Sequence, residues 1–129
     1  MNEAKKILIV EDELPLLKVL TDRFKQEGFI IFQAKNGLEG YKAALESRPD
    51  IILLDIILPI LDGINMLEKV RKDSKGENIP VIILTNLNDI KAINQAMNIG
   101  TYDYLIKSDW NLEDLVKKVK ERLNTWRKY

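Results

Sequence analysis

Residues 51–63 read IILLDIILPILDG and contain the strongest indication of the fold. The run from Ile51 to Leu54 is apolar at every position, which is typical of a strand covered on both faces, as in a parallel sheet. Asp55 follows at once, and the Asp62-Gly63 pair is typical of a turn. This stretch therefore predicts a buried strand over 51–55 that ends in a carboxylate.

Four similar runs lie outward from this segment, and all are too short to be buried helices. They cover residues 6–10, 30–34, 81–85 and 102–106. Segments with helical spacing follow each run, and this alternation indicates an α/β doubly wound sheet with right-handed crossovers. We therefore expect a single domain over residues 1–129, with a five-stranded parallel sheet and five helices.

Apolar residues recur at helical spacing in five segments. The predicted stripes are Leu17, Leu20 and Phe24; Leu38, Tyr41, Ala44 and Leu45; Ile64, Leu67, Val70 and Arg71; Ile90, Ile93, Ala96 and Met97; and Leu112, Leu115, Val116, Val119, Leu123 and Trp126. The predicted boundary residues are Gly28 after the first helix, Asn36-Gly37 before the second and Gly100 after the fourth. The last helix is expected to begin at Asn111 as its N-cap, with Asp114 at position N3 and Trp110 packed on Leu115.

The composition excludes several kinds of catalytic and metal-binding site. The chain has 129 residues, 46% of them hydrophobic, and 20 basic and 20 acidic residues give a net charge of zero. It has no Cys and no His, which excludes thiol nucleophiles, Ser-His-Asp catalysis and His- or Cys-ligated metals. Any metal must be held by oxygen, as Mg²⁺, Mn²⁺ and Ca²⁺ are.

Neither a membrane nor a nucleic-acid partner is indicated. A spanning helix needs roughly 20 apolar residues, and no run of that length occurs. The polar start from Met1 to Lys6 is not followed by a signal peptide. We therefore expect a cytoplasmic protein.

Charged and polar residues gather where the predicted strands end. The acids Glu11–Glu13 follow the first strand, Asp55 the third, Thr85 the fourth and Lys107 the fifth. In doubly wound sheets the functional site lies beyond the carboxyl ends of the strands. If strands three and four lie beside strand one, several carboxylates crowd one crevice, and a hard divalent cation is their natural compensation.

Each of these residues also has a simpler interpretation. Asp55 could cap the following turn, and one of the acids Glu11–Glu13 could cap the first helix, which Pro15 fits at an early position. Thr85 could be an ordinary strand-end residue and Lys107 a surface lysine. Their joint occurrence at strand ends favours a site.

Four segments in this order and spacing resemble the receiver domain of bacterial two-component response regulators. They are Ile7–Asp12, Asp55–Gly63, Val81–Thr85 and Tyr104–Lys107, and the resemblance covers essentially the whole chain. It implies a flavodoxin-like fold with strand order 2-1-3-4-5, and a single domain similar to chemotaxis regulators.

The resemblance implies a phosphoacceptor aspartate with bound Mg²⁺. Asp55 corresponds to the nucleophile that becomes an aspartyl phosphate. Asp12 corresponds to a direct metal ligand, Glu11 to an acid that reaches the metal through water, and the backbone carbonyl of Ile57 to a further ligand.

The remaining matched residues imply a switch. Lys107 would pair with one phosphoryl oxygen and the Thr85 hydroxyl would donate to another. Tyr104 corresponds to the aromatic switch residue that turns inward when Thr85 moves. The element expected to shift is the face formed by helix four, strand five and helix five.

This sequence departs from the family pattern in several places. Ser108 follows the lysine where relatives usually have proline, so we expect a trans peptide bond there. Asn86 stands where relatives often have alanine. Ile57 and Leu87 are apolar where many relatives have polar groups near the attacking water.

Three alternative functions compete with this interpretation. An Asp-nucleophile, Mg²⁺-dependent phosphatase of the haloacid-dehalogenase type would have Asp-x-Asp after the first strand, whereas the candidate nucleophile follows strand three and position 57 is Ile. A flavodoxin relative would bind phosphate after strand one, where Glu11–Glu13 would repel it. A pseudo-receiver that only docks partners would not need the full set of acids, Thr85 and Lys107.

The resemblance implies a histidine kinase or phosphotransfer protein as partner, and no enzymatic activity beyond the domain's own phosphorylation and dephosphorylation. We expect a monomer or weak homodimer that binds no nucleic acid directly. The chain ends just after the last predicted helix, which leaves open a stand-alone regulator or a piece of a longer one. The sequence names neither the kinase nor the downstream target.

Overall fold

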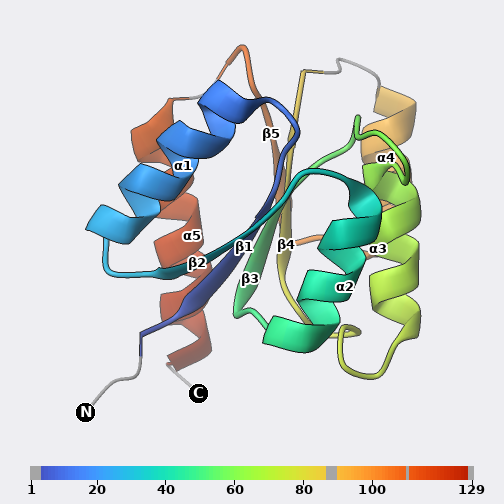
Figure 1. Ribbon diagram of the computed structural model, residues 1–129, viewed down its shortest axis with the longest axis horizontal. Helices are drawn as coiled ribbons and strands as arrows, with labels where there is room; N and C mark the ends of the chain where they lie inside the picture. The colour runs from blue at the N-terminus through green and yellow to red at the C-terminus, as the bar shows by residue number, and fades with distance from the viewer. Residues whose placement is uncertain (1–3, 87–89, 110, 128–129) are drawn as a thin grey trace.

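The computed structural model describes residues 4–86, 90–109 and 111–127 (Figure 1). Its strands form one parallel sheet in the order β2-β1-β3-β4-β5. The strands are β1 (Lys6–Val10), β2 (Ile30–Ala34), β3 (Ile51–Asp55), β4 (Val81–Thr85) and β5 (Asp103–Ile106). This is the flavodoxin-like α/β fold with the predicted strand order.

The helices cover both faces of the sheet. They are α1 (Leu14–Gln26), α2 (Gly37–Ser47), α3 (Gly63–Lys72), α4 (Ile90–Gly100) and α5 (Leu112–Arg127). Helices α1 and α5 lie on one face, and α2, α3 and α4 lie on the other (Figure 1). Each of the first four strands is followed by a helix that leads back to the start of the next strand, as parallel pairing requires.

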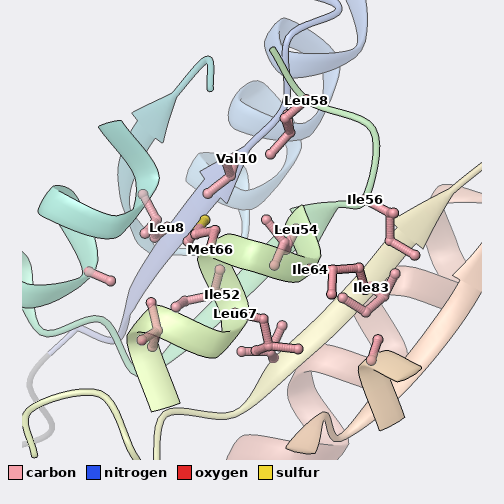
Figure 2. Close-up of a cluster of buried hydrophobic side chains, with 14 of the residues drawn as sticks. Leu8, Val10, Ile52, Leu54, Ile56, Leu58, Ile64, Met66, Leu67 and Ile83 are labelled. Carbon is pink, nitrogen blue, oxygen red and sulfur yellow. The ribbon is translucent and has the colours of Figure 1, made fainter. Parts of the chain in front are cut away.

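Alternate residues of β3 supply the two halves of the core. Ile51 and Leu53 pack with the cluster under α1 and α5, whereas Ile52 and Leu54 pack with the cluster under α2, α3 and α4 (Figure 2). All four side chains are fully buried. Because successive side chains of a strand point to opposite faces, a central strand covered on both sides must be apolar throughout.

The predicted strands agree with the structure except at one end. The strand predicted over 102–106 begins at Asp103, one residue later. Tyr102 donates its backbone amide to the Val81 carbonyl at 2.8 Å, but its side chain is exposed.

Two predicted helix stripes are partly wrong. In α2, Leu38 is 41% exposed, and the contact surface is instead provided by Gly40, where an added Cβ would lie 2.7 Å from the sulfur of Met66. In α4, Ile93 and Ala96 are buried, whereas Ile90 and Met97 are exposed. Helical spacing predicts which residues share a face, but it does not show which part of that face another element covers.

The helix boundaries follow the capping residues. Gly28 lies just beyond α1 with a φ of 96°. The Asn36 side chain accepts a hydrogen bond from the Glu39 amide, and Asn111 accepts one from the Asp114 amide, so both cap their helices as predicted. Trp110 and Trp126 lie outside the residues whose side chains are described.

Arg71 joins the carboxyl-terminal ends of two helices. Its Nε and Nη2 both donate to the carbonyl oxygen of Gly100, at 3.0 and 2.7 Å, and its Nη1 donates to the carbonyl of Gly76 at 2.8 Å. The guanidinium thus satisfies an end carbonyl of α4 from its position on α3, where a positive charge also complements the helix dipole. Burial lowers the pKa of Arg71 from its ordinary value.

None of the described helices combines the length and apolar character needed to cross a membrane.

Candidate functional site: an acidic pocket at the strand ends

The candidate site lies at the carboxyl-terminal edge of the sheet, which is the upper edge in Figure 1. Glu11 and Asp12 follow β1 directly, Asp55 is the last residue of β3, Thr85 ends β4 and Lys107 follows β5. Parallel strands bring all their carboxyl ends to one edge, and the order β1-β3-β4-β5 makes these residues neighbours.

The ammonium group of Lys107 is central to the pocket. Its Nζ lies 2.7 Å from Glu11 Oε1 and 3.0 Å from Asp55 Oδ2, and a third oxygen, Glu13 Oε1, lies 3.8 Å away. The Lys107 side chain is only 7% exposed. Burial acts to lower the pKa of Lys107, but its hydrogen bonds to Glu11 and Asp55 outweigh burial and raise it.

Three carboxylates converge beside this ammonium. Glu11, Asp12 and Asp55 each offer an oxygen atom, and these atoms lie within 4.8 Å of one another. Glu11 and Asp55 are buried, whereas Asp12 is exposed at the mouth. Burial raises the pKa of Asp55 and of Glu11 above the ordinary values, and the contacts with Lys107 offset this only in part.

The loop after β3 holds Asp55 in place. Asp55 Oδ1 accepts a hydrogen bond from the Ile57 amide at 3.2 Å, and the Gly63 amide donates to the Ile56 carbonyl at 2.8 Å. A Cβ at Gly63 would lie 2.2 Å from the backbone oxygen of Asp55, so only glycine permits this close approach of α3. The side chain of Ile57 is 55% exposed.

Thr85 and Tyr104 differ sharply in exposure. Thr85 is completely buried at the end of β4, whereas Tyr104 on β5 is 39% exposed. The amide of Lys107 donates to the Thr85 carbonyl at 2.7 Å. The peptide bond between Lys107 and Ser108 is trans, as expected from the missing proline.

The structure brings Glu11, Asp12, Asp55, Thr85 and Lys107 to one edge, where the Ile57 amide donates a hydrogen bond to Asp55. The sequence pattern indicates a turn at Asp62-Gly63, but it does not indicate the close contact between Gly63 and the Asp55 backbone. Glu13 precedes α1 without capping it through its side chain. Its carboxylate instead faces Lys107.

The donor set fits a hard divalent cation. All the converging side-chain donors are carboxylate oxygens, which Mg²⁺ prefers, and at least one of them is accessible from solvent. The pocket holds more carboxylates than the single ammonium can neutralise. Added positive charge would therefore be stabilised there.

Comparison with known proteins identifies the family. The model of the response regulator receiver domain matches residues 7–120. The chain therefore belongs to the response regulator receiver domain family, whose members accept phosphoryl groups from histidine kinases and phosphotransferases in two-component signalling.

Individual relatives agree with this assignment. The chain is 35% identical to sporulation initiation phosphotransferase F of Bacillus subtilis over 123 residues, which cover 95% of each protein. A CheY-like receiver domain protein from Methanospirillum hungatei is 28% identical, with a TM-score of 0.90 and 98% of each chain covered.

The receiver domain of the sensor histidine kinase PA1611 from Pseudomonas aeruginosa has magnesium coordinated in its active-site cleft. It is 26% identical, with a TM-score of 0.83, and the match covers 92% of this chain and 97% of that one. The chain spans about half the length of several other curated relatives, which are described as transcriptional regulators.

Proposed function

We propose that the protein is a phosphoacceptor switch of a two-component phosphorelay, phosphorylated at Asp55 in a Mg²⁺-dependent reaction. One observation carries the proposal: the buried Asp55 carboxylate lies 3.0 Å from the Lys107 ammonium, inside a cluster of carboxylates. A purely structural aspartate would not need this surplus of acids around it.

In the proposed reaction, an oxygen of Asp55 attacks phosphorus in line with the bond to the donor. That bond, to a histidine nitrogen of the kinase or phosphotransfer protein, breaks as the new P–O bond forms. The electron pair stays on the imidazole nitrogen. Phosphoryl transfer of this kind depends on position and on charge neutralisation. The hydrogen bond from the Ile57 amide supplies position by holding Asp55 Oδ1.

Lys107 and Thr85 are proposed to bind the phosphoryl oxygens. The Lys107 ammonium already contacts the acceptor carboxylate, so it is placed to pair with a group attached there. The buried Thr85 lies on the neighbouring strand end, and its hydroxyl would donate to a second oxygen. Each interaction strengthens as negative charge is added to Asp55.

Glu11, Asp12, Asp55 and the backbone carbonyl of Ile57 would hold Mg²⁺. The ion would supply neutralisation of charge on the transferring group. Glu11 would act through water, because its Oε1 already accepts from Lys107 and its Oε2 accepts from the Glu13 amide at 3.1 Å.

Tyr104 is proposed to report the phosphorylated state. Its ring is exposed on β5, next to Ile83 in the register with β4 and two residues from Thr85 in that strand. Movement of Thr85 toward the phosphoryl group would open space for the ring to turn inward. The surface of α4, β5 and α5 would then differ between the two states.

Intact mass after incubation with a small acyl phosphate and Mg²⁺ tests the proposal. We expect one phosphate adduct in the wild type and none in Asp55→Asn, which keeps the shape and removes the nucleophile. Asp62→Asn is the matched control, because Asn caps α3 as well as Asp does. Equal labelling of Asp55→Asn and the wild type would exclude Asp55 as the acceptor. Continuous turnover of phosphate esters would favour a phosphatase instead.

A further inference from the structure

A cavity of about 510 Å³ lies at the end of the sheet opposite the acidic pocket. It is formed where β1, β3 and β4 begin, with Lys5, Asp50 and Pro80 directly before these strands and Arg122 of α5 beside them. Its volume is within the range of about 300–1,000 Å³ that is usual for small-molecule sites. Nothing in the proposed phosphorylation reaction uses this region.

Four cationic side chains line the cavity: Lys5, Arg48, Lys75 and Arg122. Among the described residues, none of the four forms an ion pair with a carboxylate. By contrast, Lys107 in the acidic pocket is paired, as is Lys118, which contacts Asp103 at 2.5 Å. The cavity therefore concentrates positive charge that other described side chains do not neutralise.

The single carboxylate of the lining does not cancel this charge. Asp50 accepts a hydrogen bond at 2.7 Å from the backbone amide of Lys6, which fixes it at the start of β1. Nor do the four cations serve to cap helix ends. The end carbonyls of α2 and α4 are bound instead by Lys6 Nζ, 3.0 Å from the Ser47 oxygen, and by Arg71.

Arg48 occupies a backbone conformation that disfavours its residue type. It follows α2 with φ of 50° and ψ of 61°, the left-handed region in which glycine or asparagine is preferred. The backbone of Arg48 is therefore strained, and its side chain borders the cavity.

A second cavity of about 290 Å³ adjoins the first and shares Asn78, Ile79, Pro80 and Arg122 with it. Tyr102 lines this second cavity, and the Arg122 guanidinium lies 5.6 Å from the centre of its ring. The adjoining space thus offers the Tyr102 ring, the Asn78 amide, the Glu77 carboxylate and the apolar side chains of Ile79 and Pro80, which can stack on and hydrogen-bond to a heterocyclic base. The first cavity offers cations, which suit phosphate groups.

We propose that the two cavities together bind a nucleoside polyphosphate. Its phosphate groups contact Lys5, Arg48 and Lys75, and its base lies toward Asn78 and Tyr102. This site is separate from Asp55 and does not depend on the phosphoacceptor function.

Isothermal titration calorimetry with ATP and GTP tests this inference. EDTA in the buffer keeps Mg²⁺ from bridging the nucleotide to the acidic pocket. We expect saturable binding that weakens about tenfold or more in Arg48→Asn/Lys75→Gln, since charge-assisted contacts to phosphate are lost. Lys25→Gln/Lys42→Gln removes the same charge at exposed positions outside the cavity and should bind like the wild type. Lys75→Gln alone provides a milder variant if the double variant is poorly folded.

Amide chemical shifts locate the site independently, with the largest changes expected in residues 48–50 and 74–80. Four outcomes would overturn the proposal. These are no saturable binding at about millimolar nucleotide, equal weakening in the control variant, shifts centred on residues 11–13 and 55–57, or pyrophosphate binding as tightly as the nucleotides. The last would show that no base is recognised.

Discussion

The backbone amide of Lys107 lies 2.7 Å from the carbonyl oxygen of Thr85, so a hydrogen bond joins the ends of β5 and β4. The two side chains proposed to contact the phosphoryl group therefore come from adjacent strand ends joined by a backbone hydrogen bond. We therefore expect a displacement of either residue to shift the other.

Lys107→Ala should separate phosphorylation from switching. Asp55 and the metal-binding acids remain, so we expect some phosphorylation by an acyl phosphate. We also expect loss of the response of α4, measured by amide hydrogen exchange with and without a phosphate mimic. Lys117→Gln, an exposed change on α5, is the control. An equal α4 response in Lys107→Ala and the wild type would count against Lys107 as the link.

The same substitution should lower stability in the absence of Mg²⁺. It leaves Glu11 and Asp55 buried without their cation, a loss that costs about 3–5 kcal/mol for a buried ion pair. Urea unfolding in EDTA measures this change, and Lys107→Gln serves if the alanine variant is unfolded. A free energy of unfolding equal to that of the wild type would mean that the ammonium does not stabilise the acids.

Mg²⁺ should raise the melting temperature of the wild type by mass action, with about 1.4 kcal/mol gained at tenfold excess over the dissociation constant. Asp12→Ala should abolish this response. It should also raise stability in EDTA, because one like charge leaves the cluster. Glu46→Ala removes an exposed acid from α2 and should keep the response. A wild-type melting temperature independent of Mg²⁺ would show that the acidic pocket is not a metal site.

Gly63→Ala should lower stability by about 1–3 kcal/mol or more, the usual cost of overpacking. The added Cβ would meet the Asp55 backbone oxygen at 2.2 Å, and neither backbone segment can move freely. Asn65→Ala, an exposed change in the same turn of α3, should cost much less. Thermal unfolding of the two variants compares them, and similar melting temperatures would contradict the close approach.

The phosphorylated state should be long-lived. Ile57 follows the proposed acceptor closely, its amide bonds Asp55, and its exposed, branched and apolar side chain cannot orient a water molecule. Leu87, which was expected to act with it, lies outside the described residues. Hindering the water by about 1–3 kcal/mol slows hydrolysis roughly ten- to a hundredfold.

Ile57→Asn with Leu87→Glu should therefore shorten the lifetime, measured as loss of the phosphate adduct by intact mass. Ile60→Asn, at another exposed isoleucine of the same loop, is the control for added polarity. Loss of the wild-type phosphate within seconds, or no change in the double variant, would disprove the steric explanation.

The sheet and the acidic pocket were predictable because both follow from short sequence patterns. The apolar run Ile51–Leu54 has no solvent-facing position, so it indicates a central strand, and parallel strands must bring Asp55 and Lys107 to one edge. The distances between them were not predictable, since they depend on how the sheet twists and on side-chain rotamers.

Helix packing was less predictable. Leu38 has the right spacing for a buried position, but α2 approaches α3 through Gly40, where the absence of a side chain makes the contact possible. A glycine has no hydrophobic signature in a periodic pattern. For the same reason, the close contact of Gly63 with the Asp55 backbone was not predictable from the sequence.

The Arg71–Gly100 contact has a mechanical consequence for signalling. Two nitrogens of a half-buried guanidinium fix the last carbonyl of α4 to α3. We therefore expect that end of the helix to act as a pivot, so that a displacement of α4 grows with distance from Gly100. A small change near the strand ends would then displace the first turn of α4 the most, where Ile90 is 71% exposed.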